Sequence, residues 1–270
     1  NQAPNILQTT RALAAVPFKV VAYAFMTDTA QQADLILPST LMLEQTDLLG
    51  SYLHPYVQLV RAVLSSPGET RDDYWIVTEL GKRLDPPILM PSMKEAFRMS
   101  LENPHLETNL EELQNHGSIR ARCPDVPYKG LKFAHSDGLY HPPLVLHDES
   151  VPPAGYGLRL LSLIRRHAIH SQIPPEEQQM PPRVWVSPAT RQQYVPDPNP
   201  TAWLISPLGR MTVLLRTMEG LQDGVVVYRR GDWMKLGGGI NRLIQDGVTD
   251  LGNGTPFYEQ YVRLESNKEE

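Results

Sequence analysis

The sequence predicts an α/β first part, residues 1–145, followed by an all-β second part, residues 155–270. Apolar runs at 18–25 and 33–38 are typical of strands buried on both faces of a parallel sheet. After residue 158 the chain consists of short β-prone runs separated by Gly and Pro turns. That pattern predicts a closed barrel or a sandwich.

Capping patterns and periodicity predict the helices of the first part. Ser92 followed by Glu95 forms a capping-box pattern. Thr108 followed by Glu111 forms another, and Gly117 is placed to end that helix. The helices are expected over 5–16, 71–84, 92–102 and 108–117, the later ones as an insertion, and a further strand is expected over 56–63.

Residues 118–158 are rich in proline and are interpreted as the linker that closes the first part. Within it, Asp137-Gly138 predicts the turn of a short hairpin at 132–140. Pro207-Leu208-Gly209 predicts a tight turn between two strands of the second part. The strands of that part are expected at 158–164, 183–187, 202–206, 210–215, 224–229 and 258–264.

Composition excludes several classes of protein. With 41% hydrophobic and 20% charged residues, the 270-residue chain is neither collagenous, nor a coiled coil, nor disordered. Its net charge of −5 argues against non-specific nucleic-acid binding. No apolar run is long enough to span a membrane and no signal peptide is visible, so we expect a soluble protein of the cytoplasm or periplasm. The single cysteine, Cys123, excludes an internal disulfide and a Cys-rich zinc or iron–sulfur site in this chain.

The strongest candidate site directly follows the first β-prone run of the second part. Residues 165–172 read Arg-Arg-His-Ala-Ile-His-Ser-Gln. Arginine forks match phosphate oxygens, and Ser and Gln add hydrogen bonds that can be oriented. The segment therefore predicts a pyrophosphate site. A solvated loop is the alternative, and the residues alone leave both interpretations open.

Other candidates carry less. Thr27-Asp28-Thr29 follows the first strand, where α/β sheets bind ligands, but a helix N-cap is the favoured interpretation. Gly237-Gly238-Gly239 allows close approach of a ligand but lacks the P-loop and dinucleotide patterns. Glu44 stands alone, the histidines form no metal pair, and no nucleophile has an orienting base. No catalytic residue and no metal ligand is assigned.

Several motifs follow one another along the chain: Thr27-Asp28-Thr29-Ala30, 33–38 and Glu44, then 160–172, 206–210, 231–243 and 256–265. In this order they resemble the molybdopterin oxidoreductases of the dimethyl-sulfoxide-reductase type, over almost the whole chain. The resemblance implies that the first part belongs to the third, α/β domain of that family. It implies that the second part is the domain that binds a molybdopterin dinucleotide in a six-stranded double-psi barrel.

The resemblance also implies residues that bind molybdopterin guanine dinucleotide carrying molybdenum or tungsten. Asn241 would bond the pterin edge, with Trp233 packing nearby and Tyr258 beside the ligand. Thr27 and Thr29 would line the dinucleotide site in the α/β part. Four further residues would contact the phosphates or the pterin, namely Arg165, His170, Ser171 and Gln172.

The chain departs from the family pattern in two places. Tyr23-Ala24 stands where many relatives carry an Asp, and 196–200 replaces a Gly-Asp turn. The family's iron–sulfur cysteines and metal-ligating residue lie upstream of the matching region, so the chain resembles roughly the last third of such an enzyme.

The expected partners are upstream domains or a catalytic subunit, together with an iron–sulfur electron-transfer subunit. The alternatives are a non-catalytic cofactor-binding or docking module, and an unrelated hydrolase or dehydrogenase. The sequence has neither the G-x-S-x-G motif of such a hydrolase nor the G-x-G-x-x-G motif of such a dehydrogenase.

Overall fold

The computed structural model describes residues 2–267, which form two compact units. The barrel unit combines the chain up to Pro17 with the chain from Pro143 onward, and the α/β unit is Phe18–Pro142. The barrel unit thus includes the first helix, which the sequence pattern placed with the α/β part. The predicted division into 1–145 and 155–270 stays a prediction. Among the described residues, no helix is both long and apolar enough to cross a membrane.

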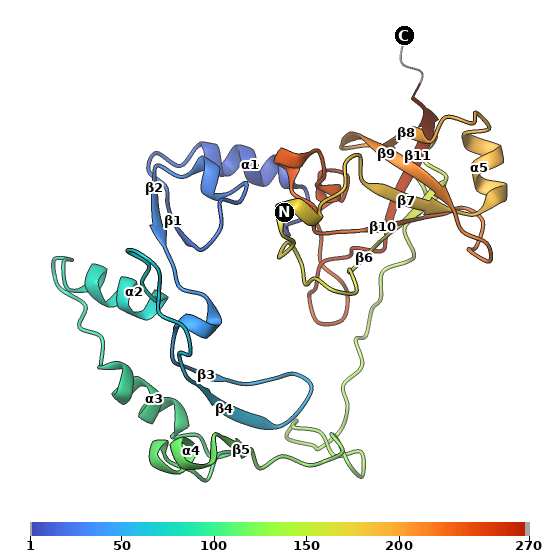
Figure 1. Cartoon of the computed structure of the whole chain (residues 1–270). Coiled ribbons are helices and arrows are strands. Elements are labelled where there is room, and N and C mark those ends of the chain that lie inside the picture. The colour runs from blue at the N-terminus through green and yellow to red at the C-terminus, as the bar shows by residue number, and fades with distance from the viewer. Residues whose placement is uncertain (1, 268–270) are drawn as a thin grey trace. The chain divides into compact units, whose positions relative to one another are not determined.

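The barrel unit contains a closed six-stranded barrel with strand order β10-β6-β11-β8-β9-β7 (Figure 1). Two neighbouring pairs, β10 with β6 and β7 with β9, are parallel, and the other pairs are antiparallel. All six predicted strands are present, which confirms the barrel. They are β6 (Leu158–Leu163), β7 (Arg183–Val186), β8 (Thr201–Ser206), β9 (Gly209–Thr217), β10 (Val225–Arg229) and β11 (Gln260–Ser266).

Alternation along the strands fills the barrel. In β6, Leu158, Leu160 and Ser162 are fully buried, while the residues between them are partly exposed. This is the period of two that turns every second side chain into a barrel. Ser206 pairs with Gly209 across the β8–β9 turn, which confirms the predicted tight turn. Apolar side chains from all six strands form one core with Ile240, Leu243 and Ile244.

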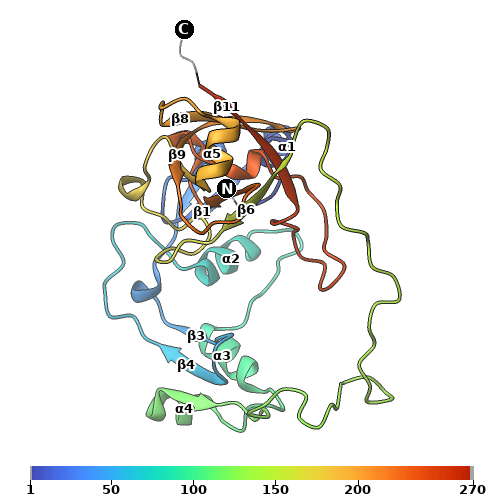
Figure 2. The same ribbon diagram turned by 90° about the vertical axis from the view of Figure 1, so that its right-hand side faces the viewer.

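A short helix, α5 (Pro188–Tyr194), was not predicted and lies beside the barrel, where it contacts β11 (Figure 2). The Ser187 hydroxyl accepts a hydrogen bond from the Thr190 backbone N–H at 3.0 Å. Pro188 occupies the first helical position, where its missing N–H is harmless. Ser187 was interpreted as the end of a strand, although it is the start signal of this helix.

The first helix of the chain, α1 (Ile6–Ala14), is joined to the barrel unit through Asn5. The Asn5 backbone N–H donates to the Ile244 carbonyl at 2.7 Å, and its side-chain amide donates to Asp246 Oδ1 at 2.9 Å. Asn5 has a φ of 44° and makes no capping hydrogen bond. It therefore ties the N-terminal segment to residues 244–246.

In the α/β unit, β1 (Val20–Tyr23) and β2 (Leu35–Pro38) form a two-stranded parallel sheet, which confirms the predicted parallel pairing. The prediction that both faces of the first strand are buried is wrong for this chain. Val20 is 46% exposed and Tyr23 is 39% exposed. Within residues 2–267 the sheet has only these two strands, so its side chains lack the covering layers that parallel sheets normally have.

Two of the remaining helices of this unit, α3 (Met93–Leu101) and α4 (Leu110–His116), form a core with a three-stranded antiparallel sheet. Ser92 caps α3 as predicted, because its hydroxyl accepts from the Glu95 N–H at 3.2 Å. The predicted Thr108 cap is wrong: the Asn109 side chain accepts from the Glu112 N–H at 3.0 Å instead. The elements are α2 (Asp73–Gly81), α3 (Met93–Leu101), α4 (Leu110–His116), β3 (Asp47–Leu49), β4 (Tyr56–Val60) and β5 (Ser118–Arg120), of which β3 and β5 were not predicted.

The proline-rich stretch contains a turn at Asp137-Gly138 without the predicted hairpin strands. The Phe133 N–H donates to the Gly138 carbonyl at 3.0 Å, but no strand ladder follows. Further along, His147 binds Asp250 through its backbone N–H and its ring Nδ1. The Tyr261 hydroxyl donates to the Ser150 carbonyl at 2.9 Å. Residues 147–150 are therefore fastened to the barrel unit.

Truncation of a barrel core side chain should cost much more stability than truncation of an exposed one. Leu204 is fully buried and Leu251 is 62% exposed. We expect Leu204→Ala to lower the free energy of unfolding by about 2–5 kcal/mol and Leu251→Ala to change it by less than about 0.5 kcal/mol. Denaturant unfolding followed by tryptophan fluorescence checks this, and equal losses would contradict the described core.

The His147–Asp250 pair should be visible in a titration. Hydrogen bonding to Asp250 raises the pKa of His147 above its usual 6.5, and the same contact lowers the pKa of Asp250 below 3.8. The pair of protonated His147 and ionised Asp250 is therefore fully formed between the lowered pKa of Asp250 and the raised pKa of His147. It is lost as the pH rises through the raised pKa of His147. NMR titration of the His147 ring should show this raised pKa. Asp250→Asn should return it toward 6.5, whereas Asp246→Asn should leave it unchanged.

Candidate functional site

Two loops meet at one rim of the barrel because β6 and β10 run parallel and end side by side. The loop that follows β6 begins at Ile164, and the loop that follows β10 contains Gly231. Gly231 has a φ of 115°, and a Cβ on it would lie 2.0 Å from the His170 carbonyl oxygen. The Trp233 ring N–H donates to the Ser171 carbonyl at 2.8 Å. Only glycine at position 231 permits this close approach of its backbone to the His170 carbonyl.

A buried carboxylate lies where these loops join. Asp232 is 1% exposed, forms an ion pair with Arg165 and accepts a hydrogen bond from the Tyr228 hydroxyl. Burial raises the pKa of Asp232, against the opposing effects of the Tyr228 hydrogen bond and the Arg165 charge. Burial also raises the pKa of Tyr228 well above 10. The network links the barrel interior, through Tyr228, to the loop that carries Arg165.

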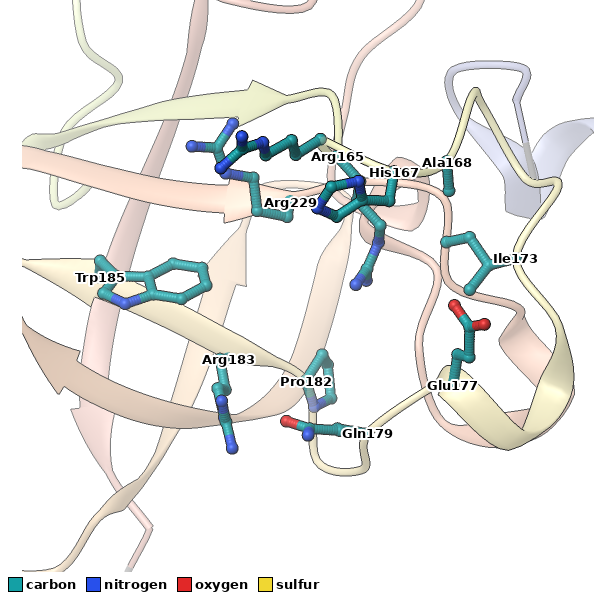
Figure 3. Close-up of a pocket in the computed structure, with 11 residues that line it drawn as sticks. Arg165, His167, Ala168, Ile173, Glu177, Gln179, Pro182, Arg183, Trp185 and Arg229 are labelled. Atoms are coloured by element: carbon teal, nitrogen blue, oxygen red, sulfur yellow. The ribbon is translucent and has the colours of Figure 1, made fainter.

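Beside this network lies a cavity of about 390 Å³ (Figure 3). Arg165, His167 and Arg229 lie along one side of it in Figure 3, and Pro182 and Gln179 lie along the other. Four arginines and one carboxylate line it, so its charge is strongly positive. The residues are Arg165, Arg166, His167, Ala168, Ile173, Glu177, Gln179, Pro182, Arg183, Trp185 and Arg229.

This lining can bind a multiply charged anion. A guanidinium presents its donors in a planar fork that matches phosphate oxygens. The Arg165 Nε is buried and has no hydrogen-bond partner among the described residues. The Trp185 ring offers an aromatic surface on the cavity wall.

Residues 165–168 of the predicted segment line the cavity. Of the four residues in it that the family resemblance implies, only Arg165 does so. Ser171 accepts a hydrogen bond from Gln2 Nε2 at 3.3 Å, while His170 and Gln172 are exposed on the same loop. Trp233 is 4% exposed and lies under that loop. The roles expected for these residues stay predictions.

The other predicted residues lie elsewhere. Asn241 is 1% exposed, and its amide donates to the Ala3 carbonyl at 3.0 Å. Tyr258 is 46% exposed and precedes β11. Thr27 and Thr29 belong to the α/β unit, between β1 and β2, where the Thr27 hydroxyl accepts from the Ala30 N–H at 3.2 Å. This bond closes a turn before the short helix Ala30–Gln32, whose N-cap residue is Thr29 and has no side-chain capping bond.

Sequence reasoning missed several cavity residues that lie on strands. Arg183 and Trp185 alternate with Val184 and Val186, which are fully buried. The same alternation, read from the sequence, places Arg183 and Trp185 on the outer face of the barrel. Arg229 is the last residue of β10. That these outward residues share a cavity with the loop follows from barrel closure, which no local pattern shows.

Among the residues that the structure describes, no three His, Cys, Asp or Glu side chains come together as a metal site. Cys123 is exposed and unbonded to another cysteine. The site is thus a positively charged cavity at the rim of a mixed β-barrel, with a lining that is chemically suited to an anionic ligand.

Comparisons with known proteins agree on one family. The molybdopterin oxidoreductase profile matches residues 1–83. The probable oxidoreductase YyaE of Bacillus subtilis is 27% identical over 97% of this chain and 43% of its own length. The probable dimethyl sulfoxide reductase chain YnfF of Escherichia coli is 22% identical over 89% of this chain and 37% of its own. The structure of acetylene hydratase from Pelobacter acetylenicus matches 97% of this chain and 42% of that one, with a TM-score of 0.76 and 19% identity.

Residues 1–83 match the molybdopterin oxidoreductase family, and nearly the whole chain is similar to part of relatives that include a probable dimethyl sulfoxide reductase chain. It spans less than half of the length of the curated relatives YyaE and YnfF. The structural likeness to acetylene hydratase shows that the fold is shared over nearly the whole chain.

Removal of Arg165 should destabilise the barrel unit, because it leaves the Asp232 carboxylate buried without its cation. We expect Arg165→Ala to lower the free energy of unfolding by about 2–3 kcal/mol. Arg183→Ala, which removes an exposed arginine from the same cavity, should change it by less than about 0.5 kcal/mol. Denaturant unfolding at neutral pH compares the two, and equal stabilities would show that the ion pair carries no net stability.

Proposed function

We propose that this chain supplies the cofactor-binding barrel of a molybdenum or tungsten oxidoreductase, and that the arginine cavity holds the diphosphate of molybdopterin guanine dinucleotide. The observation that carries the proposal is the cavity itself. Four guanidinium groups from one loop and two strands converge on it, against the single carboxylate of Glu177. A diphosphate has the negative charge and the pairs of oxygen atoms that planar guanidinium groups bind.

The remaining cavity residues fit the nucleotide end of such a ligand. Trp185 offers a ring on which guanine can stack. Glu177 supplies carboxylate oxygens, which are acceptors for the two N–H groups on the edge of guanine. Gln179 supplies both a donor and an acceptor. In this proposal the arginines provide affinity, and Glu177 and Gln179 provide preference for the base.

The residues implied by the family resemblance extend the proposed site beyond the cavity. His170, Ser171 and Gln172 would contact the phosphates or the pterin from the same loop as Arg165. Asn241 and Tyr258 would contact the pterin, with Trp233 supporting the loop from below. In the α/β unit, Thr27 and Thr29 would line a dinucleotide site. The support for these roles is their place in the family motifs.

The barrel is proposed to be of the double-psi type. Two parallel neighbour pairs, β6 with β10 and β7 with β9, occur among six strands that otherwise pair antiparallel. Parallel neighbours need crossover connections rather than hairpins, and crossovers of this kind are what a double-psi barrel contains.

When bound, the cofactor supplies two-electron transfer of an oxygen atom or a hydride equivalent at its metal. The residues of this chain would hold and orient it and neutralise its phosphates. The expected partners are the polypeptide that corresponds to the rest of the relatives' length and an iron–sulfur electron-transfer subunit.

A second candidate is a non-catalytic docking module for a catalytic subunit. The exposed apolar side chains of β1 and β2 favour it, among them Val20, Tyr23 and Leu35.

The cavity proposal predicts guanine nucleotide binding that depends on its arginines. We expect the purified full chain to bind GDP, with affinity that falls as salt is raised. Arg166→Ala combined with Arg183→Ala should weaken binding by at least tenfold, since charge-assisted hydrogen bonds contribute about 1.5–3 kcal/mol each. Calorimetric titration measures both. Fluorescence of the oxidised pterin and assays for molybdenum and tungsten measure native cofactor in the same preparations.

The matched control is Arg210→Ala. Arg210 lies over the Trp203 ring at 4.4 Å and does not line the cavity, so its loss should leave GDP affinity unchanged. If Arg210→Ala weakened GDP binding as much as the cavity substitutions do, binding would depend on net charge alone, and the cavity would be rejected as its site. Binding of GDP in preference to ADP, lost in Glu177→Gln, would support the guanine contact.

A further inference from the structure

The arginine cavity has a carboxylate built in behind it. Asp232 does not line the cavity, yet its buried side chain is paired with Arg165, which does. We infer that Asp232 is a positioning residue: it holds the Arg165 guanidinium in the one orientation that presents its free donors to a diphosphate. This inference rests on the proposed function, because it concerns the same cavity.

The position of Asp232 is fixed from two sides. The Tyr228 hydroxyl donates to its Oδ2, and Tyr228 is itself 1% exposed inside the barrel. Gly238 lies against its other side, where an added Cβ would come within 2.2 Å of the Asp232 Cβ. The carboxylate therefore has little freedom to follow Arg165 if the arginine moves. Arg165 must instead adapt to the carboxylate.

The contact with Asp232 uses only part of the Arg165 fork. The Nη2 group donates to Asp232 Oδ1, whereas the Nε is buried without a hydrogen-bond partner among residues 2–267. The guanidinium has five N–H donors in a rigid plane. Fixing one of them fixes the direction of all the others. The Arg165 side chain is 28% exposed and lines the cavity, so the donors of its accessible part are already oriented for a ligand oxygen, and less entropy is lost when the ligand binds.

Charge alone argues the opposite effect for Asp232. A carboxylate beside a cavity that binds anions weakens that binding by Coulomb repulsion. If Asp232 acts only through its charge, its removal must tighten anion binding. If it acts by positioning Arg165, its removal must weaken anion binding despite the lost negative charge. The sign of the change therefore separates the two roles.

Inorganic pyrophosphate is the probe, because it has the phosphates but no base. We expect Asp232→Asn to weaken pyrophosphate binding by roughly tenfold in calorimetric titrations of the full chain, the loss of about one charged hydrogen bond. Glu177→Gln is the matched control. It makes the same carboxylate-to-amide change on the cavity wall itself. We expect it to tighten binding of the same probe.

Tyr228→Phe is the second variant, and it changes no charge. It removes the hydrogen bond that fixes Asp232. We expect a smaller loss of pyrophosphate affinity, of a few fold. It also keeps the inference testable if Asp232→Asn does not fold, which thermal unfolding and circular dichroism detect.

The outcomes separate the inference from the proposed function. Opposite signs for Asp232→Asn and Glu177→Gln would support the positioning role. Unchanged or tighter binding in a folded Asp232→Asn chain would overturn it while leaving the cavity as an anion site. Where only Tyr228→Phe folds, unchanged affinity in that variant would overturn it. Absence of pyrophosphate binding by the unaltered chain would overturn both.

Discussion

Parallel pairing of β6 with β10 is the constraint on which the site depends. The pairing runs from Arg159 with Val225 to Leu163 with Arg229, so both strands end at the same rim of the barrel. The loops that follow them start side by side, which is how Arg165 meets Asp232 from 67 positions away in the chain. Closure through β7 then adds Arg183 and Trp185 to the same cavity.

Local signals in the sequence were enough to predict most of the barrel. Alternation of apolar residues and Gly or Pro turns depend on a few neighbouring residues, and they located all six strands. The errors at helix starts arise because neighbouring polar residues compete for the capping position. Asn109 caps α4 in place of Thr108, and Ser187 starts a helix where a strand was expected to end. The three-residue strands β3 and β5 are too short to show a period.

The site was predictable only in part, for a related reason. Arg165 lies in a segment rich in Arg, His, Ser and Gln, which is typical of phosphate-binding loops. The sequence alone therefore identified Arg165 as a candidate. Arg183, Trp185 and Arg229 sit in ordinary β patterns, and their shared cavity exists only after six strands have closed. Asp232 shows no signal of burial in its sequence. Its environment comes from Tyr228 on the preceding strand and from Gly238 on the following loop.

The two units differ in how fully they cover their apolar side chains. The barrel encloses one large core, and α3 and α4 form a second, smaller one with the three-stranded sheet. The β1–β2 sheet has no such cover within the described residues. Parallel sheets are stable when layers pack on both faces. The exposed side chains of the β1–β2 sheet are therefore the part of this chain best suited to contact another polypeptide.

The isolated thiol of Cys123 gives this two-unit chain a practical property. It is the only cysteine in the sequence, it is exposed, and it belongs to the α/β unit. Three of the four tryptophans, at 185, 203 and 233, belong to the barrel unit. One maleimide dye therefore labels a single position, and resonance energy transfer from those indoles reports changes in the separation of the two units, above the contribution of Trp75, which shares a unit with Cys123.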